Sequence, residues 1–181
     1  MKALSQAGIT QASRLWHCDE MRFGLWGQVR RRWGRKGVKI IQRVQIVFQW
    51  SYLVLAVDVV RGELRWAWSQ RMNQQQLVPI FQAWPMTGVV WDGAPSHRGK
   101  LMGEVGFKRI FLPAYSPELN PAERVFEEVR RHIEGKVYPS VQAKKAAIEH
   151  LLRQLRSDKN RLRRLVSWDW IQQTMAQLPN A

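Results

Sequence analysis

The chain is poor in cysteine and acidic residues and lacks any long apolar run. Its single cysteine, Cys18, excludes an internal disulfide framework and a cysteine-based zinc site, and fits a reducing compartment. No stretch approaches the roughly 20 apolar residues of a membrane-spanning helix, and Met1 to Thr10 lacks the apolar core of a secretory signal. Internal repeats and low-complexity linkers are also absent. These absences predict a cytoplasmic protein that does not enter membranes.

The scarcity of acidic residues leaves a strong positive charge. The 181 residues include 29 Lys and Arg but only 14 Asp and Glu, which gives a net charge of +15. Such an excess predicts a polyanionic partner, with DNA or RNA as the first candidates, because neutralising phosphates releases condensed counterions. The length suits one domain, and 45% hydrophobic residues are enough for a folded core.

The hydrophobic pattern changes along the chain from β-rich to helical. The run Gly88 to Trp91 is apolar throughout, which is typical of a strand covered on both faces. We predict an α/β fold with strands first and helices last. The expected strands cover 14–25, 38–50 and its antiparallel continuation 52–60, 64–69, 88–91 and 109–112. The expected helices cover 73–85, 98–105, a stretch opened by Asn120 and Pro121, 141–155 and 161–175.

Three acidic residues stand at unusual positions. Asp19 lies inside an expected strand, Asp92 at the end of a buried one, and Glu123 in the first turn of a helix. Strand interiors disfavour aspartate, but carboxylates at strand ends and helix starts can converge above a sheet and hold a hard cation such as Mg2+. Two such ions can activate the attacking oxygen and stabilise the leaving oxygen when a phosphodiester bond is cleaved. A basic protein with this site is a candidate nuclease.

Each carboxylate also has a purely structural interpretation. Asp19 could pair with one of the many arginines. Asp92 followed by Gly93 resembles a turn. If Asn120 caps its helix, Glu123 stands at the position of a capping-box glutamate. Position alone leaves these alternatives open.

Three sequence blocks carry a family resemblance. The first is Cys18-Asp19-Glu20 with Phe23, the second runs from Trp91 to His97 (WDGAPSH), and the third from Leu112 to Glu123 (LPAYSPELNPAE). In this order they resemble the catalytic blocks of mariner-superfamily DDE transposases, particularly the bacterial insertion-sequence branch. The third block is the most specific. The basic segment from Arg32 to Gly37 is similar to one that follows the first block in that family.

The resemblance implies a ribonuclease-H-like mixed sheet of three antiparallel strands followed by parallel strands, flanked by helices. It implies metal-dependent DNA cleavage and strand transfer, with Asp19, Asp92 and Glu123 as catalytic residues and ligands of two Mg2+ or Mn2+ ions. We expect this catalytic core to span residues 14–135. Residues 136–181 are expected to form basic C-terminal helices packed on it, and residues 1–13 an N-terminal remnant or linker.

The implied partner is double-stranded DNA, both transposon ends and target, in the bacterial cytoplasm at the nucleoid. Members of the family carry an N-terminal helix-turn-helix region, and none is recognisable before Arg14. We therefore expect a homodimer, or an assembly with a separate DNA-recognition region if the chain is one frame of a split gene. The alternative is a truncated, catalytically silent DNA-binding remnant.

The chain departs from the family pattern at a few positions. Gly93 stands where the family usually has Asn, Ala122 where it has Ile, and Phe126 where Trp is common. Thirty residues, 93 to 122, separate the second and third carboxylates, which is fewer than usual. The change at Gly93 matters most, because an Asn there could orient the aspartate before it.

Other residues near the three blocks are candidate helpers. We assign supporting roles to Asn120, to His97 as a phosphate or substrate ligand, and to Glu127, one turn beyond the third carboxylate. Alternatively, His97 caps a short helix, and Glu127 makes an ion pair with Arg130 or Arg131.

A basic run with one tryptophan is the expected DNA contact. Its positive side chains suit phosphate binding, and a tryptophan flanked by Gly and Arg can stack on bases. A solvated loop is the alternative. The residues assigned to DNA are Arg30, Arg31, Arg32, Trp33, Arg35 and Lys36.

Overall fold

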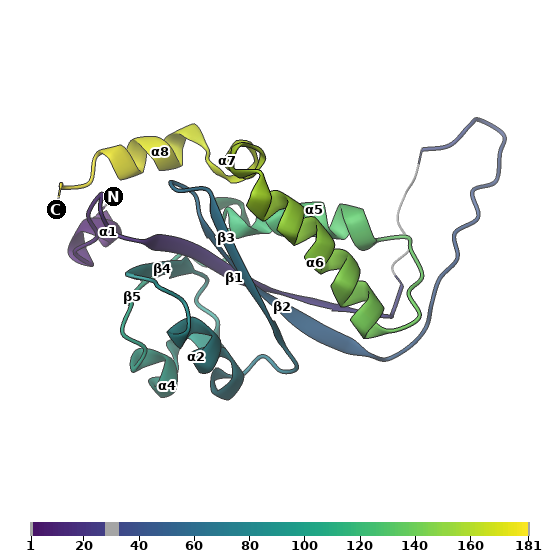
Figure 1. Ribbon diagram of the computed structural model, residues 1–181, viewed down its shortest axis with the longest axis horizontal. Coiled ribbons are helices and arrows are strands. Elements are labelled where there is room, and N and C mark those ends of the chain that lie inside the picture. The colour runs from purple at the N-terminus through teal and green to yellow at the C-terminus, as the bar shows by residue number, and fades with distance from the viewer. Residues whose placement is uncertain (1, 28–32, 181) are drawn as a thin grey trace.

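A five-stranded mixed sheet forms the centre of the protein, in a computed structural model that describes residues 2–27 and 33–180 (Figure 1). The strand order is β3-β2-β1-β4-β5. β1 pairs with β2 and β2 with β3 in antiparallel fashion, whereas β4 runs parallel to both β1 and β5. The strands are β1 (Leu15–Gly24), β2 (Trp50–Asp58), β3 (Glu63–Ser69), β4 (Gly88–Trp91) and β5 (Lys108–Phe111). This confirms the predicted mixed sheet.

Side chains alternate between two cores on the opposite faces of β1. Met21 and Phe23 belong to a cluster with residues of α5 (Ala122–Ile133) and α6 (Val141–Ser157). Trp16 and Cys18 belong to a second cluster, with residues of α2 (Gln74–Gln82) and α4 (Lys100–Gly103). The period of two along a strand produces this division. Helices thus cover both faces, which explains why β4 is apolar at every position.

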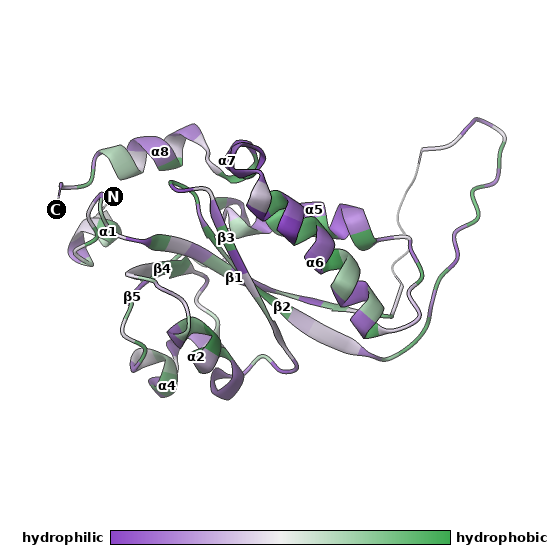
Figure 2. Ribbon diagram, in the orientation of Figure 1, coloured by the Kyte–Doolittle hydropathy of each residue, from purple (hydrophilic) through white to green (hydrophobic). Residues whose placement is uncertain are grey.

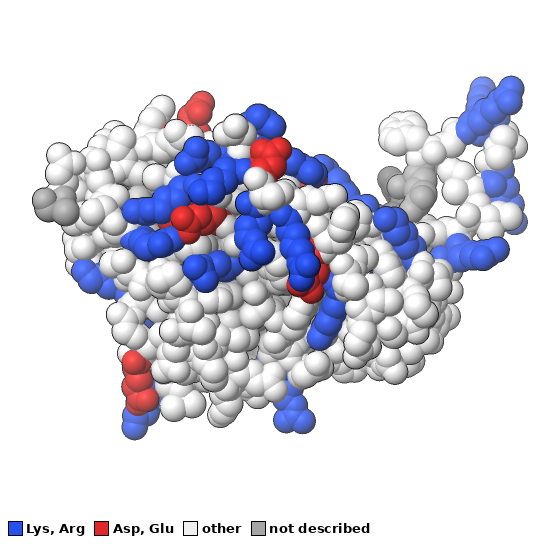
Figure 3. Space-filling model, viewed as in Figure 1, with Lys and Arg blue, Asp and Glu red and all other residues white. Residues whose placement is uncertain are grey.

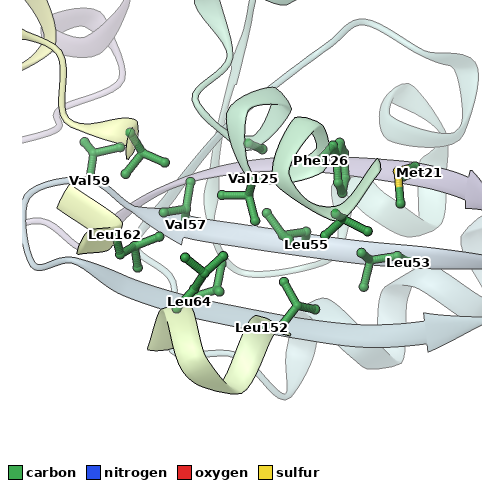
Figure 4. Packing of buried hydrophobic residues seen from close by; sticks show 14 of the residues in the cluster. Met21, Leu53, Leu55, Val57, Val59, Leu64, Val125, Phe126, Leu152 and Leu162 are labelled. Atoms are coloured by element: carbon green, nitrogen blue, oxygen red, sulfur yellow. The ribbon is translucent and has the colours of Figure 1, made fainter. Parts of the chain in front are cut away.

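The larger core lies between the sheet and the C-terminal helices. Figure 4 shows Phe126 and Val125 of α5 pointing onto Leu55 and Val57 of β2, with Leu152 of α6 nearby. Burying each such side chain contributes about 1.5 to 3 kcal/mol. Hydrophilic and hydrophobic residues are mixed along α6 (Figure 2), and all but Lys144 of its buried residues are hydrophobic.

The strand expected over residues 38–50 is wrong for residues 38–49, and only Trp50 belongs to a strand, β2. Residues 38–49 form no strand; with 33–37 they make an arm, residues 33–49, that extends away from the sheet (Figure 1). The sequence has β-prone residues, but β1 ends at Gly24, opposite Trp50, so no neighbouring strand continues beyond that point. Hydrogen bonds hold the arm at Gln49, whose carbonyl accepts from Leu25 N at 2.9 Å, and at Gln45, whose side chain donates to Tyr138 O at 3.0 Å.

Helix boundaries also differ from the prediction. In place of the helix expected over 98–105, the chain forms α3 (Pro95–Arg98) and then α4, and in place of the helix expected over 161–175 it forms α7 (Lys159–Val166) and α8 (Asp169–Ala176). The division falls at Ser167, whose hydroxyl donates to Val59 O at 2.8 Å and turns the chain out of its helix. A short 3₁₀ helix, η1 (Pro117–Leu119), precedes α5.

The N-terminal residues pack on the domain. They form α1 (Lys2–Gln6), and Leu4 and Ile9 are buried in the larger core. Lys108 at the start of β5 donates to Gly8 O at 3.1 Å. Of the helices in the described part of the chain, none is long and apolar enough to cross a membrane.

Candidate active site

The three predicted carboxylates line one pocket. Asp19 comes from β1, Asp92 directly follows β4, and Glu123 lies in the first turn of α5. His17 pairs with Val90 in the parallel ladder, so Asp19 and Asp92 stand two residues further along neighbouring strands, at the same level. The pocket has a volume of about 640 Å³, and its walls also include Arg98, Tyr115 and Asn120.

Asp19 is a largely buried carboxylate with few donors. Its Oδ1 accepts from Glu20 N at 2.8 Å, and its Oδ2 accepts from Asn120 Nδ2 at 3.3 Å. Burial, and then the negative charges of Glu20, Glu123 and Asp92, raise the pKa of Asp19 from 3.8 to about 7. The carboxylates therefore repel one another, and a cation between them would relieve that repulsion.

Asn120 joins the start of α5 to β1. Its side chain is buried, donates to Cys18 O at 2.9 Å and accepts from Ala122 N at 3.1 Å. The helix begins at Ala122 with Pro121 as its cap, one residue later than predicted, although Asn120 still satisfies a first-turn N–H. These bonds fix the first turn of α5, and with it Glu123, beside Asp19.

Glu123 does not form a capping box. The Asn120 N–H donates to Pro117 O at 2.9 Å instead, and the Glu123 carboxylate accepts from both terminal nitrogens of Arg130, at 3.2 and 3.3 Å. Both side chains of this ion pair are about one-third exposed, so it contributes at most about 1 kcal/mol. A cation can displace Arg130 at small cost.

Asp92 stands on an exposed turn. Its side chain is 59% exposed, and its Oδ1 accepts from Ala94 N at 3.1 Å, which is the turn that the sequence alternative described. The same oxygen lies 2.6 Å from His97 Nδ1. A Cβ at Gly93 would come within 2.5 Å of the Arg98 guanidinium. In this chain the bonds from Ala94 N and His97 Nδ1 orient Asp92, in the place of an Asn at position 93.

His97 is buried between two carboxylates. Its side chain is 1% exposed, its Nε2 lies 3.0 Å from Glu20 Oε2, and its ring stacks on Trp91 at 4.3 Å. Burial lowers the pKa of His97, but the hydrogen bond and charge of Glu20, together with Asp92, outweigh it and raise the pKa to about 9. The ring therefore donates to both carboxylates at neutral pH and presents no nitrogen to a phosphate.

Sequence reasoning missed Glu20. The signal was present, because two consecutive acidic residues within a strand place one carboxylate on each face of a sheet. Glu127, in contrast, is outside the carboxylate pocket and pairs with Arg131 and, at 3.1 Å, with Arg124. The alternative interpretation of Glu127, an ion pair with Arg130 or Arg131 on the helix surface, is confirmed with Arg131 as the partner.

The basic surface extends over the C-terminal helices and the arm. Figure 3 shows Lys and Arg side chains gathered over α6 and α7 and along the arm. Trp33, Arg35 and Lys36 are exposed. The other predicted DNA contacts, Arg30, Arg31 and Arg32, lie outside the described residues.

The oxygen donors of the pocket suit a hard divalent cation, which would also offset the burial and the neighbouring negative charges that raise the pKa of Asp19. Within the described ranges, no three Asp, Glu, His or Cys side chains are already arranged to hold an ion. The Glu123 carboxylate is turned toward Arg130 and would have to rotate to join the other two carboxylates around an ion.

Comparisons with known proteins place this site in a family. The model of the DDE superfamily endonucleases matches residues 14–144, which include all three carboxylates. A search of curated protein sequences found no match.

Solved structures share the fold. The Mos1 transposase paired-end complex with left transposon end is 16% identical, with a TM-score of 0.66 over 86% of this chain and 52% of that chain. The Mos1 strand transfer complex is 15% identical, with a TM-score of 0.68 over 92% and 54%. The catalytic domain of Mos1 mariner transposase is 16% identical, with a TM-score of 0.59 over 86% and 76%.

The present chain spans about half the length of the first two of these proteins. Their likeness shows a ribonuclease-H-like fold, as predicted, and the match over residues 14–144 shows the family. The chain belongs to the DDE superfamily endonucleases.

Proposed function

We propose that this chain is the catalytic part of a transposase that cuts DNA strands and joins their ends to a target. The observation that carries the proposal is the meeting of Asp19, Asp92 and Glu123 in one pocket of a DDE superfamily endonuclease. The three carboxylates are the catalytic residues and the metal ligands. The net charge of +15 supports DNA as the substrate.

The side chains of the pocket fit divalent metal ions of the Mg2+ or Mn2+ type. Bound there, two such ions would supply the charge that activates an attacking oxygen and stabilises a leaving one. Asp19 in β1 and Asp92 directly after β4 stand at the same level, and Asn120 keeps Asp19 in place. Glu123 completes the set by releasing Arg130, which is then free to face the DNA backbone.

The sequence blocks support a more specific family branch, and the exposed basic residues support a DNA-binding surface. We assign the chain to the bacterial insertion-sequence branch, in the cytoplasm at the nucleoid, and the core to residues 14–135. The exposed Trp33, Arg35 and Lys36 support DNA binding by the basic segment. Solved relatives are paired-end complexes, which supports action as a homodimer or with an N-terminal DNA-recognition region.

Nicking of supercoiled plasmid in Mn2+ tests the proposal. Asp92→Ala is expected to abolish nicking while leaving salt-sensitive DNA binding close to that of the parent. Its thermal midpoint should fall only modestly, because the side chain is 59% exposed and the His97 ring keeps its contacts with Glu20 and with the Asp92 main-chain oxygen. Glu104→Ala, at another exposed carboxylate, is the matched control and should nick normally. Nicking by Asp92→Ala at the parental rate would contradict the assignment.

A non-catalytic DNA-binding remnant is the second candidate, favoured by the pairing of Glu123 with Arg130. Calorimetric titration with Mn2+ separates the two functions. The enzyme is expected to bind Mn2+ with an affinity that Asp92→Ala removes. Absence of Mn2+ binding, with and without DNA, together with unimpaired DNA binding, would establish the remnant.

A further inference from the structure

Glu20 is a buried carboxylate on the face of the sheet opposite Asp19. Along β1 it alternates with Asp19, so it shares the face of Cys18 rather than that of Met21. Its side chain is only 4% exposed. The walls of the pocket include Asp19 and Asp92 but not Glu20. Glu20 is therefore not placed as a metal ligand.

The contacts of Glu20 nevertheless lead into the pocket. Its Oε2 is bonded to His97 Nε2 at 3.0 Å, and the other ring nitrogen, Nδ1, contacts Asp92 Oδ1 at 2.6 Å. Trp91 holds the plane of the ring by stacking at 4.3 Å with an interplanar angle of 7°. A buried, rigid path thus connects Glu20 on one face with a carboxylate at the rim of the pocket.

This arrangement is a poor way to stabilise a fold. Among the described residues, Glu20 Oε1 is buried without a hydrogen-bond partner. Burying a charged pair with incomplete hydrogen bonding rarely stabilises more than apolar side chains of the same volume would. Asp92, in contrast, needs support, because it stands on an exposed turn.

We infer that Glu20 is a positioning residue that holds His97 so that the imidazole fixes the Asp92 carboxylate toward the pocket. The inference rests on the proposed function, since it concerns how the same site is oriented for a cation. His97 and Ala94 both bond to Oδ1 of Asp92, which leaves Oδ2 for the cation. Without Glu20, one side of the ring loses its anchor, and Asp92 can turn toward solvent.

The test compares Glu20→Ala and Glu20→Gln with Val54→Ala. Val54 is the matched control, because it pairs with Glu20 across the sheet, is fully buried in the same core and does not belong to the carboxylate path. Its truncation lowers stability by a cavity mechanism alone. Glu20→Gln keeps the volume and one acceptor for His97 Nε2, so it preserves folding if the alanine variant does not fold.

The first readout is Mn2+ affinity by calorimetry, which requires no turnover. We expect Glu20→Ala to weaken it 10- to 100-fold, as loss of an outer partner of a metal ligand typically does, and Glu20→Gln to recover part of the loss. Val54→Ala should stay within about twofold of the parent even if its thermal midpoint falls further. In plasmid nicking, Glu20→Ala should lower kcat with little change in KM for DNA.

The outcomes separate this inference from the proposed function. If the parent binds no Mn2+, the proposed function fails, and the inference fails with it. If the parent binds Mn2+ and Asp92→Ala removes binding, but both Glu20 variants bind as the parent does, only the positioning role is overturned. Equal losses of affinity in Glu20→Ala and Val54→Ala would also overturn it, because they would reflect general destabilisation.

Discussion

Asp19→Asn should stabilise the metal-free protein at neutral pH although it removes a proposed catalytic residue. In the unfolded chain this carboxyl ionises near its ordinary pKa of 3.8, whereas in the folded chain burial and its acidic neighbours raise the pKa to about 7. Between these values the folded state holds a proton that the unfolded state has lost. The free energy of unfolding therefore falls as pH rises from about 4 to 7 and levels off above.

The size of the effect follows from the shift. Moving the pKa from 3.8 to about 7 corresponds to about 4 kcal/mol, at 1.36 kcal/mol for each tenfold change. Water in the open pocket screens part of this penalty, so we expect about 2 to 3 kcal/mol. The asparagine keeps the acceptor for Glu20 N and loses only the long contact to Asn120.

Urea unfolding in EDTA measures the difference between variant and parent. It should be near zero at pH 4 and reach about 2 to 3 kcal/mol in favour of Asp19→Asn at pH 8. Asp169→Asn, at an exposed aspartate of α8, is the control and should show no such trend. Mn2+ at saturating concentration should stabilise the parent and not Asp19→Asn. A difference that is the same at pH 4 and pH 8 would refute the reasoning.

Two further substitutions test other parts of the site. Arg130→Ala frees Glu123 from its ion pair and should raise the Mn2+ affinity measured by calorimetry up to about fivefold, which corresponds to at most about 1 kcal/mol. Unchanged or weaker Mn2+ binding would show that the ion pair does not compete with the metal. Trp33→Ala removes a fully exposed ring and should weaken binding to single-stranded DNA by about 1 to 3 kcal/mol in a fluorescence titration, with an unchanged thermal midpoint; equal affinity would leave the ring without a role in stacking.

The strands expected over 14–25, 64–69, 88–91 and 109–112 agree with β1, β3, β4 and β5 to within one residue at each end. β4 is apolar at every position because both of its faces are covered, and such a short apolar run between turns has few alternatives. The prediction of a strand fails for the arm. Its alternation from Val38 to Phe48 is typical of a strand, yet a strand also needs a hydrogen-bonding neighbour, and local sequence does not say that β1 stops at Gly24.

The sequence predicts the three carboxylates of the pocket but not the contacts around them. Block resemblance predicts Asp19, Asp92 and Glu123 together, whereas position alone leaves a turn open as the role of Asp92, and the structure contains that turn. The role of His97 was not accessible, because its partners come from β1 and from the end of β4, 77 and 5 residues away in sequence. Contacts of that kind depend on the parallel ladder that brings the two strands together.

The placement of Asp19 and Glu20 on opposite faces makes the register of β1 the point at which an insertion or deletion would do most harm. A slip of one residue exchanges the faces of every side chain in a strand. In β1 a slip in one direction would bring Glu20 to the place of Asp19 and move Asp19 to the place of Cys18, and Trp16 would change cores. Composition and charge would survive such a change. The glutamate side chain is one methylene longer than that of aspartate, so its carboxylate would not occupy the position of the Asp19 carboxylate. A frame-preserving insertion or deletion in this strand can therefore abolish activity without removing an acidic residue.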